Sequence, residues 1–222
     1  MLNLAGMPVY VARPDGPGPH PGVVVLHQLF GVDGSVRRGA DRLAAAGFLA
    51  VAPDLYHRTE PGAELPQDDE GRRRGFALMH RMDRDEVVAD VGRCLDWLRG
   101  PGGAGPRTGL LGVSLGGHAA FLAAARLDVD ATAVLFPGWL TGTEIPLSRP
   151  EPTLSLAADI RGRLLFLVGE RDHVVPPAEV ARIAAAIPRH EVVVYPDTPH
   201  AFFLDGTTPA AEDAWRRVIE FL

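Results

Sequence analysis

The feature of this chain that most limits its fold is the alternation of short apolar runs with helical patterns. The run at 22–27 (GVVVLH) is continuously apolar and rich in β-branched residues, as expected for a strand buried on both faces of a sheet. Parallel strands need long crossover connections, which are usually helices. The sequence therefore predicts an α/β fold with a mostly parallel central sheet. Further strands are expected at 48–56, 108–113, 131–136, 163–169 and 190–196.

The helices between these strands are predicted from their periodicity and end signals. From Asp83 onward the apolar residues share one helical face, and Asp83 and Glu86 have the spacing of a capping box. At 35–47, Ser35 is expected as the N-cap and Gly47 as the C-terminal stop. We therefore expect helices on both faces of the sheet. Further helices are expected at 115–127, at 176–187 and from Thr208–Pro209 to the end.

The remaining segments bear on the size of the fold. Before Val23 only one short strand is predicted, at 8–12 (PVYVA), so a small sheet is expected. The stretches 57–75 and 138–160 are rich in Gly, Pro and charge. They are expected to pass over the strand ends and are too short for a lid domain. Since three-layer α/β folds reach 222 residues without splitting, one domain over residues 1–222 is expected.

Charge and cysteine content exclude several classes of protein. The formal net charge of −6 disfavours binding to nucleic acid or to anionic membranes, which need a positive surface. The lone Cys94 permits no internal disulfide and lies on an apolar helix face, so it is expected to be a buried structural thiol. No signal-like segment and no apolar run of about 18 residues is found, so a cytoplasmic protein is expected.

The segment 112–116 (GVSLG) matches the pattern G-x-S-x-G. Five-residue patterns also occur by chance in a chain with 25 glycines, so the neighbouring elements decide whether this match is meaningful. A predicted buried strand ends at Val113 and a helix begins at Leu115, as a nucleophile elbow requires. In such an elbow the serine has a strained backbone, and glycines two residues to either side avoid a clash. The pattern predicts Ser114 as the nucleophile.

A serine hydroxyl needs a neighbouring base, and in this type of fold the acid and then the histidine follow the serine in the chain. Asp172 comes just beyond a predicted strand end, and His200 lies between the last strand and the last helix. Glu170 and Asp197 are alternative acids, although Glu170 is closer to the strand end and Asp197 has the context of a turn residue. The predicted catalytic residues are Ser114, Asp172 and His200.

Stabilisation of an oxyanion needs two backbone N–H donors. One is expected from Leu115 and the other from the loop at 27–34, where Leu29 is the best candidate. In the same loop, His27 is interpreted as a residue that fastens the chain. The other histidines, which include His118 and His173, are interpreted as surface or structural residues.

Five motifs now identify a family. They occur in the correct order and cover nearly the whole chain: HQLFGV, VAPDLYHR, GVSLGGHAAF, GERDHVVP and PHAFF. With them the sequence resembles the dienelactone hydrolase family of α/β-hydrolases. The resemblance implies an α/β-hydrolase fold without a lid domain and a hydrolase that uses neither cofactor nor metal. It also implies a mobile substrate loop near 57–75 and activity on lactones or small esters.

The sequence departs from the family pattern at two linked positions. The best-known members carry cysteine at the position of Ser114 and glutamate at the position of Gln28, where the carboxylate helps to control the thiol. An uncharged amide beside a serine is suited to a plain serine-hydrolase mechanism, because no thiol has to be restrained. The sequence therefore does not predict that this chain acts on the same substrate as the best-known members.

A third departure concerns the two arginines with which those members hold a substrate carboxylate. One of these arginines corresponds to Arg72, with Arg73 and Arg74 as alternatives. The position of the other is occupied by Leu204, so this half of the pair is missing. The run at 72–74 is equally compatible with a solvated helix start, which is the favoured interpretation. The candidates for the substrate pocket are Gln28, Phe30, Arg72, Phe202 and Leu204.

Together these observations predict a serine hydrolase that cleaves small carboxylic esters or lactones through an acyl-enzyme. The expected partner is a small ester or lactone, with no nucleic acid and no membrane; the oligomeric state is left open. One alternative is acyl transfer to peroxide or an alcohol by the same triad. The other is a ligand-binding protein on the same fold that has lost its chemistry.

Overall fold

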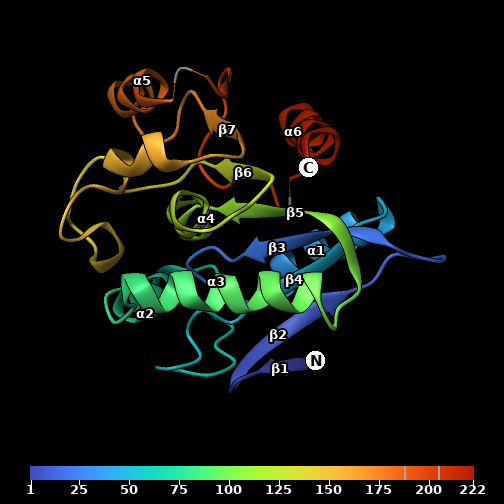
Figure 1. The fold of residues 1–222 in the computed structure, drawn as a ribbon. Helices are drawn as coiled ribbons and strands as arrows, with labels where there is room; N and C mark the ends of the chain where they lie inside the picture. The colour runs from blue at the N-terminus through green and yellow to red at the C-terminus, as the bar shows by residue number, and fades with distance from the viewer. Residues whose placement is uncertain (188, 205) are drawn as a thin grey trace.

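The computed structural model describes residues 1–187, 189–204 and 206–222, and its centre is an eight-stranded sheet of order β1-β2-β4-β3-β5-β6-β7-β8 (Figure 1). From β4 across to β8 the neighbouring strands are parallel, while β1 and β2 add an antiparallel edge. The predicted mostly parallel sheet is therefore confirmed. The strands are β1 (Leu2–Leu4), β2 (Met7–Ala12), β3 (His20–Leu26), β4 (Leu49–Pro53), β5 (Ala104–Val113), β6 (Ala131–Leu135), β7 (Arg163–Gly169) and β8 (Glu191–Tyr195).

Helices cover both faces of the sheet. Helices α3 and α4 contact each other and lie on one face, whereas α1 and α6 lie on the other (Figure 1). A salt bridge between Arg42 of α1 and Glu212 of α6, with a nitrogen–oxygen distance of 2.6 Å, joins α1 to α6. The helices are α1 (Gly34–Ala45), α2 (Asp69–Met79), α3 (Arg84–Arg99), α4 (Leu115–Arg126), α5 (Pro177–Ala186) and α6 (Pro209–Phe221), with 3₁₀ turns η1 (Pro146–Ser148) and η2 (Thr153–Asp159).

The apolar face predicted for the helix after Asp83 is the face that α3 buries. The Asp83 side chain caps this helix by accepting the N–H groups of Asp85 and Glu86, as the sequence predicts. Cys94 is fully buried on the same face, and burial raises the pKa of its thiol to about 12. The lone cysteine is therefore a protonated core residue.

Two expectations about the N-terminal part are wrong. Asp33, not Ser35, caps α1, because its carboxylate accepts the N–H groups of both Ser35 and Val36 as well as the Ser35 hydroxyl. The sheet is also larger than expected, since β1 pairs with β2 through a two-residue hairpin turn. Both turn residues, Ala5 and Gly6, have positive φ, as in turns that match the twist of paired strands.

The two excursions contain more regular structure than the sequence indicates. Residues 57–75 lead into α2, whose N-cap is Asp68, and the arginine run at 72–74 lies in the first two turns of that helix with exposed side chains, as the favoured interpretation expects. Residues 138–160 contain both 3₁₀ turns. Neither segment forms a lid domain in the described structure.

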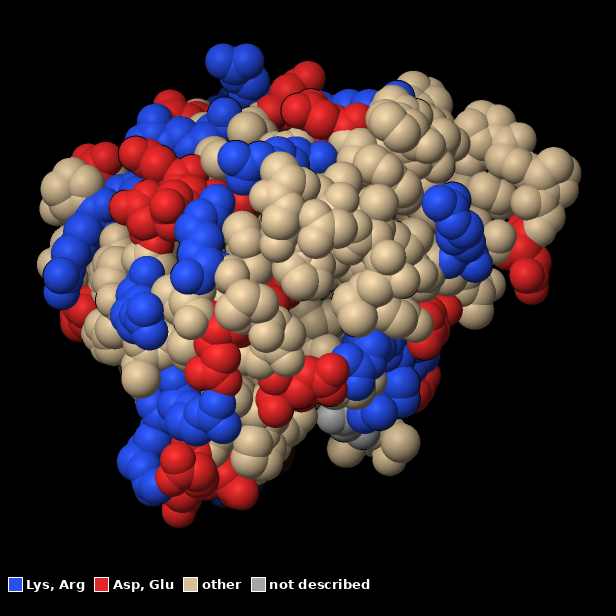
Figure 2. Space-filling model, turned by 90° about the horizontal axis from the view of Figure 1, so that it is seen from below, with Lys and Arg blue, Asp and Glu red and all other residues tan. Residues whose placement is uncertain are grey.

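The surface carries charges of both signs. On the face drawn in Figure 2, acidic and basic side chains lie next to one another around a broad uncharged area. On this face the basic residues do not gather into the single-sign patch that a nucleic-acid binder uses. Among the described residues, no helix has both the length and the apolar character needed to cross a lipid bilayer.

The turn from β5 into α4 brings backbone segments into close contact near the centre of the sheet. Ser114 has φ 55° and ψ −115°, a conformation that L-residues rarely adopt. A Cβ on Gly112 would lie 2.2 Å from the Gly116 carbonyl oxygen, and a Cβ on Gly116 would lie 2.0 Å from the Leu26 carbonyl oxygen of β3. Both neighbours are backbone atoms, so glycine is required at both positions.

We expect Gly116→Ala to lower the free energy of unfolding by at least about 2 kcal/mol, because β3 and α4 would have to separate. The matched control is Gly92→Ala in α3, where the nearest atom to an added Cβ is 3.8 Å away. That change should raise stability by about 0.5–1 kcal/mol through helix propensity. Urea unfolding followed by circular dichroism measures both effects. Equal effects of the two substitutions would contradict the conclusion that β3 and α4 lie too close together for a side chain at position 116.

Candidate active site

Ser114 lies at the carboxyl end of β5 and directly before the first residue of α4. Its N–H donates to the Leu135 carbonyl of β6 at 2.9 Å, which fixes the turn against the neighbouring strand. The residue is 8% exposed, and its Oγ lies 3.1 Å from Nε2 of His200. The strained turn thus brings the hydroxyl next to a base while keeping it open to a cavity.

His200 is oriented by Asp172, which follows the carboxyl end of β7. His200 Nδ1 lies 2.8 Å from Asp172 Oδ2, and Oδ1 of the same carboxylate accepts the N–H groups of Val174 and Val175 at 2.8 and 3.0 Å. Asp172 is 3% exposed. With the Nδ1 proton donated to Asp172, the lone pair of Nε2 faces the Ser114 hydroxyl. The Phe136 ring and the imidazole pack edge to face, with 4.7 Å between the ring centroids.

The two alternative acids are joined to each other by a hydrogen bond. Glu170 Oε2 accepts the N–H of Asp197 at 3.0 Å, and Asp197 has φ 52° in a turn. Glu170 thus supports the loop between β8 and His200. In the described structure only Asp172, among these three carboxylates, is hydrogen-bonded to His200.

The two candidate oxyanion donors flank the serine. Leu115 is the first residue of α4, where the N–H has no acceptor within the helix. Leu29 lies in the loop after β3 and lines the same cavity as Ser114. Its carbonyl accepts a hydrogen bond from the Tyr56 hydroxyl at 3.0 Å, so the loop after β4 fixes the position of this residue.

His27 fixes the peptide bond that carries the Leu29 N–H. Its Nδ1 lies 2.6 Å from the Gln28 carbonyl oxygen, and its Nε2 accepts the Leu55 N–H at 3.2 Å. Burial lowers the pKa of His27, and the neutral ring can make both bonds, with Nδ1–H as the donor. Because C=O and N–H of a trans peptide point in opposite directions, the bond to the Gln28 carbonyl also sets the direction of the Leu29 N–H.

Other histidines have different roles. His118 is fully buried, lies 2.9 Å from both the Gly138 carbonyl and Thr153 Oγ1, and has a pKa lowered by burial to about 4. It is structural, as the sequence indicates. His173 instead lines the cavity, with its ring centroid 5.7 Å from that of His200.

The cavity beside Ser114 has a volume of about 270 Å³. Gln28, Phe30 and Arg72, three of the pocket candidates, contribute to its lining. Gln28 Nε2 also donates to Ser35 Oγ at 3.3 Å, so the amide is tied to the start of α1. The lining residues that sequence reasoning missed are Gln67, Phe76, Trp139, His173, Val174 and Ala201.

Arg72 reaches the cavity from α2 but is largely solvated. Its side chain is 58% exposed and lies 3.6 Å from Asp69. Arg73 and Arg74 pair with Glu70 and Glu60 at the surface.

The structure does not bring Phe202 and Leu204 to the cavity lining. Phe202 is buried against the rings of Phe136 and Tyr195, in the loop that carries His200. Leu204 packs toward α1, where a Cβ on Gly39 would lie 3.0 Å from its side chain. Both residues thus support the loop that carries His200.

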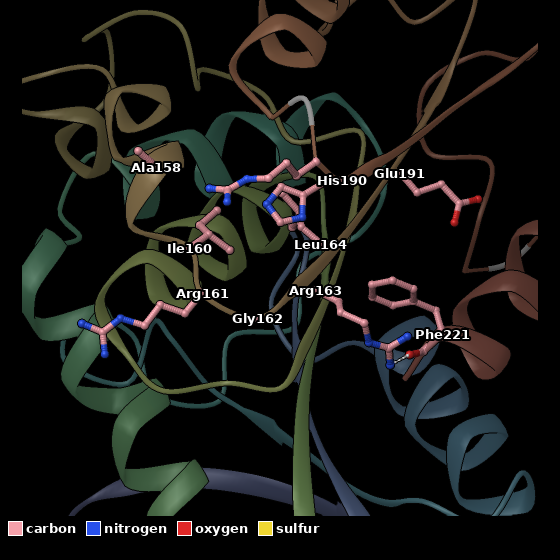
Figure 3. A pocket seen from close by; sticks show the side chains of 10 residues that line it. Ala158, Ile160, Arg161, Gly162, Arg163, Leu164, His190, Glu191 and Phe221 are labelled. Carbon is pink, nitrogen blue, oxygen red and sulfur yellow. Dashed lines mark hydrogen bonds between the residues drawn. The ribbon is translucent and has the colours of Figure 1, made fainter.

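A larger hollow of about 660 Å³ lies at the other end of the strands (Figure 3). It is bordered by Arg163 and Glu191, the first residues of β7 and β8, and by Phe221 of α6. The described side chains that line it include no serine, threonine or cysteine. The smaller cavity is therefore the candidate active site, because it holds the hydrogen-bonded hydroxyl.

Comparison with known proteins agrees with this geometry. The family profile "Dienelactone hydrolase family" matches residues 7–222. A "Putative carboxymethylenebutenolidase" of Synechocystis is 31% identical, with 98% of this chain and 90% of the relative covered. A protein of Escherichia coli K12 with the same description is 34% identical, with 97% and 81% covered.

A solved structure shows the same relationship. It is described as a "Putative Dienelactone Hydrolase" from Klebsiella pneumoniae and superimposes with a TM-score of 0.86 at 30% identity, covering 97% of this chain and 92% of the other. The order of the strands, the turn at Ser114 and the sequence match over nearly the whole chain point to one conclusion. This protein belongs to the dienelactone hydrolase family of hydrolases, which has the α/β-hydrolase fold.

Proposed function

We propose that the protein is a serine hydrolase that cleaves small carboxylic esters or lactones. The observation that carries the proposal is the continuous hydrogen-bonded series from Ser114 Oγ through His200 to Asp172, at the wall of a cavity. A hydroxyl with a base in contact and a carboxylate that orients the base is the arrangement needed for acyl transfer. Membership of a hydrolase family supports the same conclusion.

The reaction follows from these positions. His200 Nε2 removes the proton of Ser114 as its Oγ attacks the ester carbonyl, and Asp172 stabilises the imidazolium that forms. The backbone N–H groups of Leu115 and Leu29 stabilise the tetrahedral oxyanion. His200 then protonates the leaving alcohol and activates water, which releases the acyl group from Ser114.

The cavity supports a small substrate. Its volume, about 270 Å³, lies at the lower end of the range for small-molecule sites. Phe76 and Trp139 meet edge to face at its wall, with ring centroids 6.1 Å apart, so part of the lining is apolar. Relatives described as carboxymethylenebutenolidases support lactones as one substrate class. All three catalytic residues follow strands of one sheet, which supports the proposal that residues 1–222 act as one domain.

Replacing the nucleophile tests the proposal directly. We expect Ser114→Ala to lower kcat for p-nitrophenyl acetate by about 10³-fold or more, because the attacking atom is lost. Ser155→Ala, at an exposed hydroxyl that donates to the Pro152 carbonyl, should leave the rate unchanged. A fluorophosphonate probe should label wild type but not Ser114→Ala. An unchanged rate in Ser114→Ala, or folded wild type that resists labelling, would refute the assignment.

The amide beside the serine should contribute much less than the base. Gln28 donates to Ser35 and lines the cavity, so Gln28→Ala alters the shape of the loop without removing a reacting group. We expect kcat/KM to fall less than about tenfold, well below the loss caused by His200→Ala. Steady-state kinetics on one ester compares the two variants. A loss as large as that of His200→Ala would mean that the amide acts on the substrate or the oxyanion.

His27 should act as a positioning residue for the oxyanion donor. Asn at position 27 can place its amide N–H near the position of Nδ1 and keep the bond to the Gln28 carbonyl, whereas Gln can reach only the Leu55 N–H with its oxygen. We expect His27→Gln to lower kcat by about 10–100-fold with little change in KM, and His27→Asn to retain more of the rate. Equal losses of kcat in both variants would contradict this role.

A further inference from the structure

Two glutamine side chains line the cavity beside Ser114, and both are hydrogen-bonded toward Asp33. Gln67, in the segment before α2, donates from Nε2 to Asp33 Oδ2 at 3.2 Å. Gln28, in the loop after β3, donates from Nε2 to Ser35 Oγ at 3.3 Å, and the Ser35 hydroxyl donates to Asp33 Oδ1 at 2.6 Å. Two loops that are separate in the sequence thus form one polar wall of the cavity.

The chemistry of the partners determines the orientation of both amides. A carboxylate only accepts hydrogen bonds, so the Gln67 atom that faces Asp33 is the nitrogen. The single proton of the Ser35 hydroxyl lies in the short bond to Asp33, so Ser35 Oγ accepts, and the Gln28 atom that faces it is also the nitrogen. Asp33 is itself held, because its Oδ1 accepts the N–H groups of Ser35 and Val36 at the start of α1. A rotated amide would place oxygen against oxygen at either position.

The oxygen of each amide remains available for a ligand. Among the described residues, none donates a hydrogen bond to Oε1 of Gln28 or Gln67. Gln28 is only 6% exposed, yet its Oε1 is not one of the enclosed polar atoms that lack a partner, so this oxygen meets open space. The open space that Gln28 borders is the cavity beside Ser114, and the exposed Gln67 borders the same cavity. The polar wall thus offers two hydrogen-bond acceptors of fixed orientation.

We propose that this wall selects esters or lactones that carry a hydroxyl group, with the hydroxyl donating to Oε1 of Gln28 or Gln67. The inference rests on the proposed hydrolysis at Ser114. A substrate without a donor displaces water from the amide oxygens and leaves them unpaired, which costs free energy. A hydroxyl replaces the lost hydrogen bond, so a hydroxylated substrate is preferred over its unsubstituted analogue.

The charges of the lining disfavour ionic substituents. A carboxylate has no proton to donate and would face two oxygen acceptors. Arg72 attracts a carboxylate only weakly, because its side chain is 58% exposed and lies 3.6 Å from Asp69. An ammonium group would be repelled by the same guanidinium. A hydroxyl carries no charge and both donates and accepts, so it satisfies the amide oxygens without conflict with Arg72.

The rest of the lining suits a short carbon skeleton. Phe30, Phe76, Trp139 and Val174 contribute apolar surface to the cavity, and Phe76 is 36% exposed. Apolar walls with a few placed polar groups are typical of sites for small molecules. The expected substrate therefore combines one hydroxyl with a short apolar chain.

Matched esters test the preference. On wild type, kcat/KM for p-nitrophenyl β-hydroxybutyrate should exceed that for p-nitrophenyl butyrate by about fivefold or more, and p-nitrophenyl hemisuccinate should be the poorest of the three. Glycerol monobutyrate compared with propyl butyrate tests a hydroxyl on the alcohol side in the same way. A preference for the hydroxyl in either pair supports the proposal. No preference in both pairs, or a hemisuccinate faster than the β-hydroxybutyrate, would overturn it.

Substitution of the glutamines tests the assigned acceptors. Gln28→Leu and Gln67→Leu keep the approximate size of the side chain and remove the amide oxygen, so the ratio of kcat/KM within the preferred pair should fall by about threefold or more in at least one variant. The control is Arg73→Leu in α2, whose side chain is 71% exposed and does not line the cavity. It should keep the ratio of wild type. A ratio that stays unchanged in both glutamine variants would overturn the assignment.

Binding to Ser114→Ala separates this inference from the proposed hydrolysis. Isothermal titration calorimetry should show that glycerol monobutyrate binds this variant about fivefold more tightly than propyl butyrate, and Gln28→Leu or Gln67→Leu in the same background should reduce the difference. A wild type that hydrolyses no ester would refute the proposed function, whereas the calorimetric comparison would still decide the preference. Equal affinities for the two ligands, together with equal rates in both ester pairs, would leave the hydrolase proposal intact and overturn the hydroxyl preference.

Discussion

The close crossing of β3, β5 and α4 is the constraint on which the rest of the structure depends. Two glycines allow carbonyl oxygens to approach where any side chain would clash, and Ser114 takes up the strain of the sharp turn between them. The crossing places the amino end of α4 at the carboxyl end of the central strands. Loops from β3, β7 and β8 then converge on one hydroxyl because parallel strands end at the same edge of the sheet.

Backbone groups hold the polar partners of that hydroxyl. Asp172 accepts two N–H groups of its own loop, which leaves one oxygen for His200. On the other side, His27 and Tyr56 hold the peptide groups around Leu29. The site is thus assembled by hydrogen bonds that are complete before a substrate arrives, as preorganised electrostatic stabilisation requires.

Much of this arrangement can be predicted from the sequence, because its signals are local. The apolar runs locate seven of the strands, all except β1, and the glycine pattern together with chain order selects Ser114, Asp172 and His200, which the structure brings into contact. Position along the chain favours Asp172 over Glu170, and in the described structure it is the Asp172 carboxylate that is hydrogen-bonded to His200. The cap of α1 was misassigned because Asp33 and Ser35 are both good cap residues.

The cavity walls are harder to predict, because loop conformation places them. Trp139 has φ 61° and Ala201 has φ 61°, and neither residue type favours such a conformation. Leu204 is a pocket candidate from the sequence, yet it packs toward α1. The short strand β1 depends on a hairpin turn with positive φ at Ala5, which no residue preference indicates.

The buried Cys94 has a consequence for how the protein can be handled. Its thiol is enclosed and stays protonated, and the proposed nucleophile is a hydroxyl. Oxidants that convert catalytic thiolates to sulfenic acid therefore find no accessible thiol in the folded chain. A cysteine introduced at the surface would be the single site open to maleimide dyes. The native sequence thus serves as a background for site-specific fluorescent labelling without removal of its own cysteine.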